Sequence, residues 1–358
     1  MARAIAIAAL ADGRTHPNPM VGAVVVRGGR VVGEGFHRQA GSAHAEVEAI
    51  AHARGRARGA DLYVTLEPCC HFGRTPPCTE TIQAAGIRRV VFGMRDPDRR
   101  MRGKGLAALS RAGIAVDGPC MAAECRALNP AFIHWATTGT PYVIAKVGSS
   151  LDGKIADGSR RSRWITNAAA RSYTRQWRAR VDGLVIGRKT LVQDDPLLTV
   201  RLPGYDGPEP QPIVMVGQGT VPRRARLVRG GARRPALFVV PPGRARALAW
   251  LERLGHEVIA NPTDARGHRW EPLLRTLGAR GMTALLVEGG AGLLGSLLGG
   301  QRVQYAVVAI APLLLGRAAL GWTQAADLPS LPRPAGIAVV AVQRFGDNVV
   351  LEGRMRYR

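Results

Sequence analysis

The sequence predicts a two-domain α/β protein, and three observations support this fold class. The chain has 358 residues, which is more than one hydrophobic core usually serves. Short runs of strand-forming residues alternate with helical stretches along most of its length, as in sheets with mainly parallel strands. The stretch at 137–141, Thr-Thr-Gly-Thr-Pro, is typical of a linker. We therefore predict one domain over residues 1–140 and a second over residues 141–358.

Composition and charge limit which kinds of binding partner we expect for this protein. The formal net charge is +24, but nearly all of the cations are arginines spread along the whole chain. A nucleic-acid-binding face would concentrate its cations and interleave them with aromatic residues. We therefore expect no nucleic acid, and the absence of a long apolar run predicts no membrane partner. Five cysteines, two of them adjacent, do not form a disulfide framework and predict a cytoplasmic protein.

The first domain is predicted to begin with a helix that Gly13 ends. A rigid Pro-Asn-Pro loop follows and leads into a hairpin whose two-residue turn consists of glycines. Helical spacing of apolar residues then indicates a helix that begins near His44. Further elements follow in the order strand, helix, strand, helix, strand: we predict them over residues 61–66, 79–85, 88–94, 105–113 and 114–116.

A histidine and two cysteines in this domain have the composition of a catalytic zinc site. His44, Cys69 and Cys78 supply three ligands, which leaves a fourth position for water. Zinc lowers the pKa of such a water to about 7. Glu46, two residues after the histidine, is then the general acid–base that moves a proton from water to a leaving amine. His-x-Glu followed by Pro-Cys and a later Cys predicts a zinc deaminase.

A structural zinc site is the alternative, and it would require a fourth protein ligand, which Cys70 or His71 offers. The segment from Cys69 to Cys78, Cys-x-His-x-Gly-Arg-Thr-Pro-Pro-Cys, resembles the deaminase domain of the bifunctional riboflavin-biosynthesis enzymes. In these a diaminohydroxyphosphoribosylaminopyrimidine deaminase is joined to a reductase. The resemblance implies a cytidine deaminase-like α/β/α fold. Because the family usually has serine at Cys70, we predict that this cysteine is a neighbour of the zinc and not a ligand.

The same resemblance assigns two further residues of the deaminase pocket. The loop Pro-Asn-Pro-x-Val-Gly lines the pocket in the family, so that Asn18 would bond the pyrimidine. Asp96, which follows the strand at 88–94, would help to shape the pocket. Asn18 alternatively serves the geometry of the turn, and the two roles are compatible.

The second domain is predicted to alternate strands and helices. A glycine-rich turn at 287–293, Val-Glu-Gly-Gly-Ala-Gly-Leu, lies between a strand and a helix and exposes N–H groups to a phosphate. Its spacing differs from that of the Rossmann motif. We predict strands over 142–147, 183–187, 213–216, 236–240, 257–260 and 283–287. We predict one helix through Arg171, Arg175 and Arg178 and two more over 244–254 and 270–277.

These blocks resemble the reductase domain of the same enzymes, whose α/β fold is similar to dihydrofolate reductase. The resemblance implies NADPH as cofactor, and Lys154 and Asp194 are candidate charge partners for hydride transfer. The guanidinium group of arginine can bind two phosphate oxygens at once, which suits the phosphate of the substrate. The alternative for Arg178 is a position on a solvated helix face. The implied cofactor residues are Gly148, Trp164, Thr190, Asp194, Gly290, Ala291, Gly292, Leu293, Leu294, Gly295 and Ser296. The implied substrate residues are Ser162, Arg178, Leu198, Arg201 and Glu288.

Three positions depart from the family pattern. Gly217 and Gln304 replace aspartates, and Lys189 replaces a glycine. One alternative is therefore a zinc deaminase for nucleic acid or nucleotides with an inactive reductase domain, and another is a catalytically silent zinc protein with a dimerisation or regulatory role.

Our main prediction is a bifunctional, homo-oligomeric enzyme with Zn²⁺ and NADPH as cofactors and a phosphorylated pyrimidine as substrate. It deaminates 2,5-diamino-6-ribosylamino-4(3H)-pyrimidinone 5′-phosphate by hydrolysis. It then reduces 5-amino-6-(5-phosphoribosylamino)uracil to the ribitylamino product.

Overall fold

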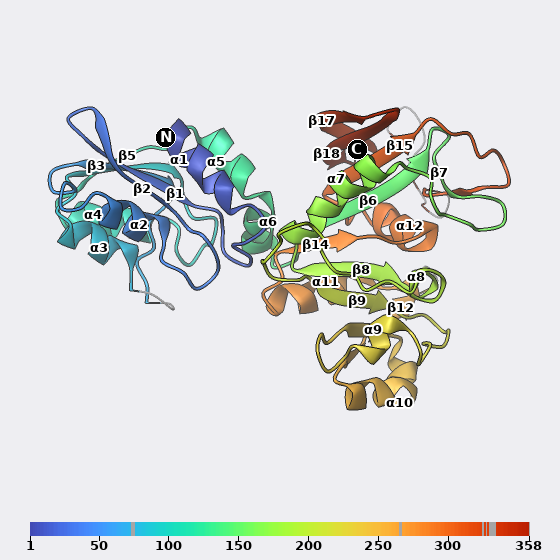
Figure 1. Cartoon of the computed structure of the whole chain (residues 1–358). Helices are drawn as coiled ribbons and strands as arrows, with labels where there is room; N and C mark the ends of the chain where they lie inside the picture. The colour runs from blue at the N-terminus through green and yellow to red at the C-terminus, as the bar shows by residue number, and fades with distance from the viewer. Residues whose placement is uncertain (73–75, 265–266, 324–325, 327, 329–333, 358) are drawn as a thin grey trace. The chain divides into compact units, whose positions relative to one another are not determined.

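The computed structural model describes residues 1–358 except 73–75, 265–266, 324–325, 327, 329–333 and 358. It contains two compact units, Met1–Gly139 and Thr140–Arg358 (Figure 1). Three residues of the Cys69–Cys78 segment, Gly73, Arg74 and Thr75, lie outside the described residues. Within the described part of the chain, no helix is both long and apolar enough to cross a membrane.

The first unit contains a five-stranded sheet formed by β1 (Gly22–Arg27), β2 (Arg30–Phe36), β3 (Asp61–Leu66), β4 (Arg89–Met94) and β5 (Ala115–Asp117). The strand order is β2-β1-β3-β4-β5. β1 pairs antiparallel with β2 and β3, and the pairs β3–β4 and β4–β5 are parallel. Gly28 and Gly29 form the β1–β2 turn with φ of 57° and 76°, a conformation that glycine adopts without strain.

Helices cover both faces of this sheet: α1 (Ala2–Ala8), α2 (Ala45–His52), α3 (Cys78–Ala84), α4 (Lys104–Arg111), α5 (Ala122–Leu128) and α6 (Pro130–Thr138). Ala49 of α2, Ile82 of α3 and Leu109 of α4 share one buried cluster with the strands. Residues of α1, α5 and α6 share another, around Cys125. The unit is therefore an α/β/α sandwich, in which Cys125 is a packing residue.

Two glycines of β2 let α2 approach the sheet closely. A Cβ at Gly33 would lie 2.2 Å from the Ala49 carbonyl oxygen, and one at Gly35 would lie 2.4 Å from the Ala49 amide nitrogen. Both distances are far below van der Waals contact, so only glycine fits there. The helix that carries Glu46 therefore packs directly against the backbone of β2.

The second unit contains a nine-stranded sheet of order β11-β10-β9-β8-β14-β6-β15-β18-β17. The seven strands from β11 to β15 in this order are parallel, and β18 runs antiparallel to β15 and β17. Its strands are β6 (Tyr142–Ser150), β8 (Gly183–Gly187), β9 (Gln211–Met215), β10 (Leu237–Val240), β11 (Glu257–Ala260), β14 (Ala284–Val287), β15 (Tyr305–Ala311), β17 (Gly336–Phe345) and β18 (Asn348–Arg356). Short strands β7 (Lys154–Ala156), β12 (Thr263–Asp264), β13 (Gly267–His268) and β16 (Leu320–Gly321) form two separate ribbons.

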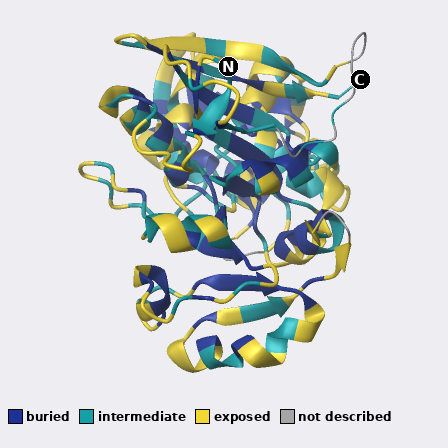
Figure 2. Ribbon diagram, turned by 90° about the vertical axis from the view of Figure 1, so that its right-hand side faces the viewer, coloured by how far each residue is buried: buried dark blue, intermediate teal, exposed yellow. Residues whose placement is uncertain are grey.

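The helices of this unit are α7 (Ala168–Arg175), α8 (Arg188–Asp194), α9 (Arg226–Arg229), α10 (Ala245–Leu248), α11 (Trp270–Ala279) and α12 (Ala291–Gly299). α11 and α12 bury their leucines against the parallel strands in one cluster. Figure 2 shows these strands as largely buried, whereas helices around them keep exposed faces.

The predicted continuous helix over 244–254 is wrong. A 3₁₀ turn at Pro242–Arg244, the short α10 and a second 3₁₀ segment at Ala249–Leu254 replace it. Leu248 and Leu251 are both buried, and their spacing of three residues suits either kind of helix. Apolar spacing alone therefore does not distinguish the two.

Candidate functional site: a metal centre and an arginine-lined groove

The three predicted zinc ligands come together in the first unit. His44 caps the start of α2, Cys78 is the first residue of α3, and Cys69 follows β3. One ligand atom from each of the three lies within 4.8 Å of the others. His44 Nδ1 is 3.1 Å from the Sγ of Cys78 and 3.5 Å from that of Cys69. One imidazole and two thiols fit a zinc site with an open position for water.

The predicted general acid–base, Glu46, lies beside these candidate ligands. Glu46 is only 4% exposed, and burial together with the negative charge of Cys69 raises its pKa to about 7. The hydrogen bond from Cys78 lowers the pKa of Cys69 to about 4, and the same contact raises the pKa of Cys78. Within the described residues, the cluster of metal-binding type includes neither Cys70 nor His71. This favours an open catalytic site over a closed structural one.

Asn18 is held by a histidine that the sequence did not single out. Asn18 Nδ2 lies 3.1 Å from His37 Nε2, and His37 Nδ1 lies 3.1 Å from the carbonyl oxygen of Ala43. A carbonyl only accepts, so Nδ1 carries the proton and Nε2 accepts from the Asn18 amide. His37 is buried, which lowers its pKa, and its ring packs edge-on against that of His44 at 5.5 Å.

Glu67 ties the metal site to the loop that carries Asp96. Its buried carboxylate accepts hydrogen bonds from the N–H groups of Asp96 at 3.1 Å and of Gly103 and Gly105 at 3.0 Å. Asp96 is half-buried, its carboxylate accepts from the Asp98 N–H, and burial raises its pKa. The Glu67 carboxylate therefore joins the end of β3 to the Asp96 loop and to the start of α4.

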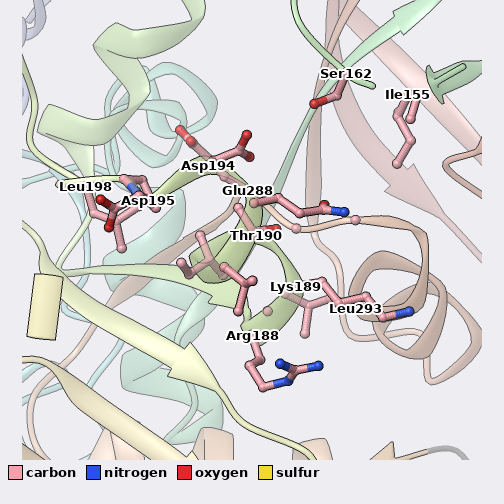
Figure 3. A pocket seen from close by; sticks show the side chains of 18 of the residues that line it. Ile155, Ser162, Arg188, Lys189, Thr190, Asp194, Asp195, Leu198, Glu288 and Leu293 are labelled. Carbon is pink, nitrogen blue, oxygen red and sulfur yellow. The ribbon is translucent and has the colours of Figure 1, made fainter. Parts of the chain in front are cut away.

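The second unit contains a large groove of about 1560 Å³ (Figure 3). It runs over the carboxyl ends of β6, β8, β9 and β14, where open α/β sheets bind ligands. The predicted residues that line it are Gly148, Ser162, Trp164, Arg178, Thr190, Asp194, Leu198, Arg201, Glu288, Gly290, Ala291, Gly292 and Leu293.

The glycine turn forms one wall of this groove. Gly290 caps α12 without a side-chain hydrogen bond, and the first N–H groups of a helix have no intrahelical acceptor. Leu294 and Gly295 are buried, and the Ser296 hydroxyl accepts from Trp270 Nε1 and donates to the Leu293 carbonyl. These last three residues thus lie behind the lining.

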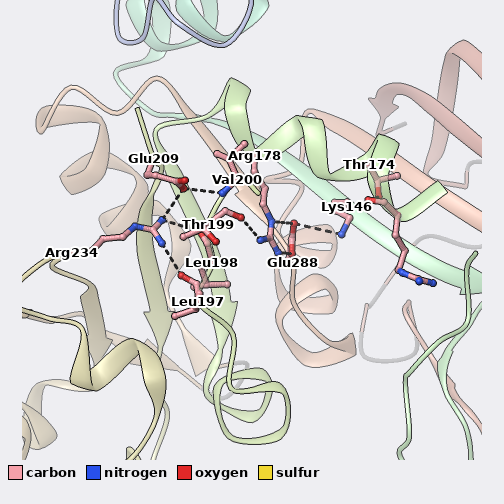
Figure 4. Close-up of polar contacts among 11 residues, drawn as sticks. Lys146, Thr174, Arg178, Leu197, Leu198, Thr199, Val200, Glu209, Arg234 and Glu288 are labelled. Carbon is pink, nitrogen blue, oxygen red and sulfur yellow. Dashed lines mark hydrogen bonds and ion pairs between the residues drawn. The ribbon is translucent and has the colours of Figure 1, made fainter. Parts of the chain in front are cut away.

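A carboxylate between two cations occupies the groove floor (Figure 4). Arg178 donates from Nε and Nη2 to the two oxygens of Glu288 at 2.9 and 2.6 Å, and Lys146 Nζ lies 3.5 Å from the same carboxylate. Burial alone would raise the pKa of Glu288, but Lys146 and Arg178 lower it to about 2. Burial lowers the pKa of Lys146. Arg178 is 6% exposed, so the solvated-face interpretation is wrong.

The loop with Leu198 and Arg201 is held in an uncommon conformation. Both residues have positive φ, 57° and 52°, which side chains disfavour. Arg234 donates to the carbonyls of Leu197 and Leu198 at 2.7 and 2.8 Å, and Glu209 accepts from Val200 N–H at 2.8 Å (Figure 4). Long-range contacts of this kind leave no local sequence pattern.

Two of the three family departures line the groove, and the third has a structural role. Lys189 and Gly217 belong to the lining. The Gln304 side-chain oxygen accepts from Val143 N–H at 2.8 Å, and the Gln304 backbone N–H donates to the Val143 carbonyl at 2.9 Å. Gln304 therefore joins β6 to the start of β15.

Comparisons with known proteins cover both units. Residues 1–94 match the cytidine and deoxycytidylate deaminase zinc-binding region, and residues 141–351 match the RibD C-terminal domain. The riboflavin biosynthesis protein RibD of Bacillus amyloliquefaciens is 41% identical over 316 residues, which cover 88% of this chain and 84% of the relative. These matches confirm the predicted fold class, a cytidine deaminase-type domain followed by a dihydrofolate reductase-like domain.

Two solved structures extend the likeness to the whole chain. Acinetobacter baumannii RibD superposes with a TM-score of 0.90 at 33% identity and covers 99% of this chain and 97% of its own. The deaminase/reductase of Thermotoga maritima gives a TM-score of 0.84 at 32% identity, over 100% of this chain and 97% of its own. With a zinc site in one unit, a ligand groove in the other and relatives that span both, the chain belongs to the RibD family of bifunctional deaminase–reductases in riboflavin biosynthesis.

Proposed function

We propose that the first unit deaminates 2,5-diamino-6-ribosylamino-4(3H)-pyrimidinone 5′-phosphate and that the second reduces 5-amino-6-(5-phosphoribosylamino)uracil with NADPH. The T. maritima relative is described as a diaminohydroxyphosphoribosylaminopyrimidine deaminase and 5-amino-6-(5-phosphoribosylamino)uracil reductase. The observation that carries the proposal is the buried Glu46 beside the cluster of His44, Cys69 and Cys78. A carboxylate next to a three-ligand metal site is the arrangement that hydrolytic deamination requires.

In the deaminase unit, His44, Cys69 and Cys78 would hold Zn²⁺, which when bound supplies a water of lowered pKa. Glu46 takes the proton from this water as the oxygen adds to the amine-bearing carbon of the pyrimidine. The same carboxyl then gives the proton to the amine, and ammonia leaves as the carbonyl forms and the second proton of the water passes to the adjacent ring nitrogen. Asn18 Nδ2 is used by His37, so its Oδ1 is left to accept from a pyrimidine amino group. Asp96 completes the pocket.

In the reductase unit, NADPH when bound supplies a hydride for C1′ of the ribosylamino group. Gly148, Trp164, Thr190 and Asp194 bind the cofactor, and the turn from Gly290 to Ser296 receives its phosphates at its groove-lining start, Gly290 to Gly292, through backbone N–H groups. Ser162, Leu198 and Arg201 bind the substrate together with Arg178 and Glu288.

Lys146 joins these substrate residues because it is buried against Glu288 and lines the groove. Its cation is therefore available to the oxygen that becomes a hydroxyl when the ribose ring opens. Lys154, the candidate from the sequence, does not belong to the lining within the described residues. The activation barrier for hydride transfer is lowered by the positioning of cofactor and substrate and by electrostatic stabilisation.

A coupled assay tests both steps on one chain. The diaminopyrimidine phosphate is supplied with NADPH, and both ammonia release and the fall of NADPH absorbance are followed. The parent gives both signals. Glu46→Gln gives neither and retains zinc, because the proton carrier is lost and the ligands are not. Glu48→Gln, on the same helix but outside the ligand cluster, behaves like the parent. Ammonia without NADPH oxidation by the parent would refute the reductase assignment.

We also propose that the enzyme is a cytoplasmic homo-oligomer. All five cysteines are free, which suits a reducing compartment. β17 lies at the end of the nine-strand order and exposes Val339, Val340 and Val342 by 54%, 63% and 61%. Exposed apolar side chains in a row are typical of a subunit interface. Light scattering gives the mass: a multimer for the parent, and a lower mass for Val340→Lys/Val342→Lys. A monomeric parent would refute this assignment.

A further inference from the structure

Residues 197–201, which we call the substrate loop, need contacts from other segments to keep their backbone conformation. Leu198 and Arg201 both have positive φ, 57° and 52°, although neither is a glycine. Such conformations persist only where the surrounding structure determines them. Arg201 also lies near other cations: burial lowers its pKa, and the charges of Arg178 and Arg175 lower it further. Backbone strain and charge repulsion therefore both favour a different position for Arg201.

A guanidinium from a distant segment binds the carbonyls of this loop. Arg234, between α9 and β10, donates from Nη1 to the Leu197 carbonyl at 2.7 Å and from Nη2 to the Leu198 carbonyl at 2.8 Å. Nη2 also donates to the carbonyl of Pro210, on the far side of the loop sequence. Three carbonyl oxygens thus surround one planar guanidinium, an arrangement that the single nitrogen of a lysine does not reproduce.

Glu209 contacts both the loop and Arg234. Its Oε2 accepts from the Val200 N–H at 2.8 Å and lies 3.7 Å from Arg234 Nη2. Burial lowers the pKa of Arg234, and the charge of Glu209 opposes this effect. The carboxylate therefore stabilises the loop directly and also stabilises the cation that binds its carbonyls.

From 197 to 200, every residue of the loop has a backbone group bonded to a charged side chain (Figure 4). Arg178, which lines the groove, supplies one of these bonds, to the Thr199 carbonyl at 2.6 Å. Arg234 and Glu209 supply the others, and neither belongs to the described lining of the groove. These two residues hold the loop without being placed to touch a ligand.

We propose that Arg234 and Glu209 are positioning residues for the reductase, which hold the substrate loop in the conformation that presents Leu198 and Arg201 to the phosphoribosylaminouracil. The inference rests on the proposed reductase function, in which Leu198 and Arg201 bind this substrate. Without the pair, only a fraction of the molecules keep the loop in place, and the apparent affinity for the substrate falls by that fraction. The loop contains none of the proposed cofactor residues, so NADPH binding does not depend on it.

Steady-state kinetics of the full chain, with the phosphoribosylaminouracil supplied directly, test the role of Arg234. Arg234→Met keeps an unbranched side chain without its donors and raises the KM for the uracil about 10-fold, as when about a tenth of the molecules stay competent. The kcat and the dissociation constant of NADPH keep their parent values, because the loss is the same in ground and transition states. Arg234→Lys recovers only part of the KM. Arg233→Met, at the exposed neighbouring position, changes none of these quantities.

Glu209 is tested with a conservative variant. Glu209→Ala raises the KM for the uracil by about 2- to 10-fold, the range of one net hydrogen bond. Glu209→Gln restores most of the parent KM, because its amide oxygen still accepts from the Val200 N–H. A Glu209→Gln variant as impaired as Glu209→Ala would contradict the assigned hydrogen bond to the loop.

Three further results would overturn the inference, and they are distinguishable. An unchanged KM in Arg234→Met would mean that the loop keeps its conformation without this residue. A lower kcat, with equal losses of affinity for the uracil and for NADPH, would mean that Arg234 supports the fold of the whole unit. A parent that oxidises no NADPH with this uracil would reject the proposed reductase function itself and the positioning role with it.

Discussion

His37 orients Asn18, the residue that we propose contacts the pyrimidine, and lies outside the cluster of candidate metal ligands. Its Nδ1–H is fixed by the Ala43 carbonyl, and its Nε2 therefore accepts from the Asn18 amide. This chain of two hydrogen bonds leaves Oδ1 of Asn18 as the atom that would face the pyrimidine in the proposed deamination. His37 also packs against the ring of His44, so one buried imidazole supports both Asn18 and a candidate zinc ligand.

We predict that His37→Phe raises the KM for the diaminopyrimidine about fivefold, since a net hydrogen bond is worth about 1 kcal/mol. The phenyl ring keeps the contact with His44, so zinc content and kcat stay close to the parent. His37→Gln, which can still accept from Asn18, restores part of the KM. Steady-state kinetics with metal analysis measure this, and a loss of zinc in His37→Phe would show a structural role instead.

Glu288 makes the stability of the second unit depend on pH. Its pKa falls from 4.5 to about 2 on folding, because Lys146 and Arg178 outweigh the effect of burial. The stabilisation is therefore complete above pH 4.5 and is lost as pH falls towards 2. The shift corresponds to on the order of 3 kcal/mol.

We predict that Glu288→Gln lowers the free energy of unfolding at neutral pH by about 3 kcal/mol, because two cations lose their buried counter-ion. The variant also loses the dependence on pH between 4.5 and 2. Urea unfolding followed by tryptophan fluorescence measures this, since five of the six tryptophans lie in the second unit. Glu257→Gln, which breaks an exposed pair with Arg280, should cost less than about 1 kcal/mol. Equal effects of the two variants would contradict the prediction.

At the scale of elements, the start of α4 is locked to the metal site. A Cβ at Gly105 would lie 1.9 Å from the carbonyl oxygen of Pro68, the residue before the ligand Cys69. Glu67 fastens the same helix through the Gly103 and Gly105 N–H groups. A shift of α4 therefore moves the backbone beside a ligand.

We predict that Gly105→Ala lowers zinc affinity by about 10-fold, the lower end for residues that support metal ligands. The added methyl must displace either α4 or Pro68. Competition with a chromophoric chelator measures the affinity. Ala107→Ser, on the exposed side of the same helix, is the control and leaves it unchanged. An unchanged affinity in Gly105→Ala would mean that α4 moves without the ligand.

The sequence predicted correctly those elements whose structure is determined by residues that are close together in the sequence. The hairpin follows from its two glycines, and the ligand trio follows from the chemistry of histidine and cysteine beside Glu46. The roles of His37 and Arg234 escaped prediction because their partners are distant in sequence or are backbone atoms, which leave no motif. Arg178 shows the same limit: its helical spacing indicates a face, and only the partner Glu288 reveals that the face is buried.

At the scale of the whole molecule, each unit has its own core and its own site. We therefore predict that a zinc chelator abolishes ammonia release and leaves NADPH oxidation intact when the phosphoribosylaminouracil is supplied directly. The groove contains only residues of the second unit, so the loss of metal from the first does not alter it. Paired assays with and without chelator measure this, and re-addition of Zn²⁺ is the control. Loss of both activities would show that the units depend on one another.

The two hydrogen bonds from Arg178 to Glu288 also affect how tightly the groove binds its ligands. Arg178 donates to Thr199 as well, so its guanidinium is immobile before any ligand arrives. Freezing a long side chain on association costs about 0.5–1.5 kcal/mol, and here that entropy is already lost when the protein folds. The groove is preorganised: a ligand meets rigid donors, and more of the contact energy is retained as affinity.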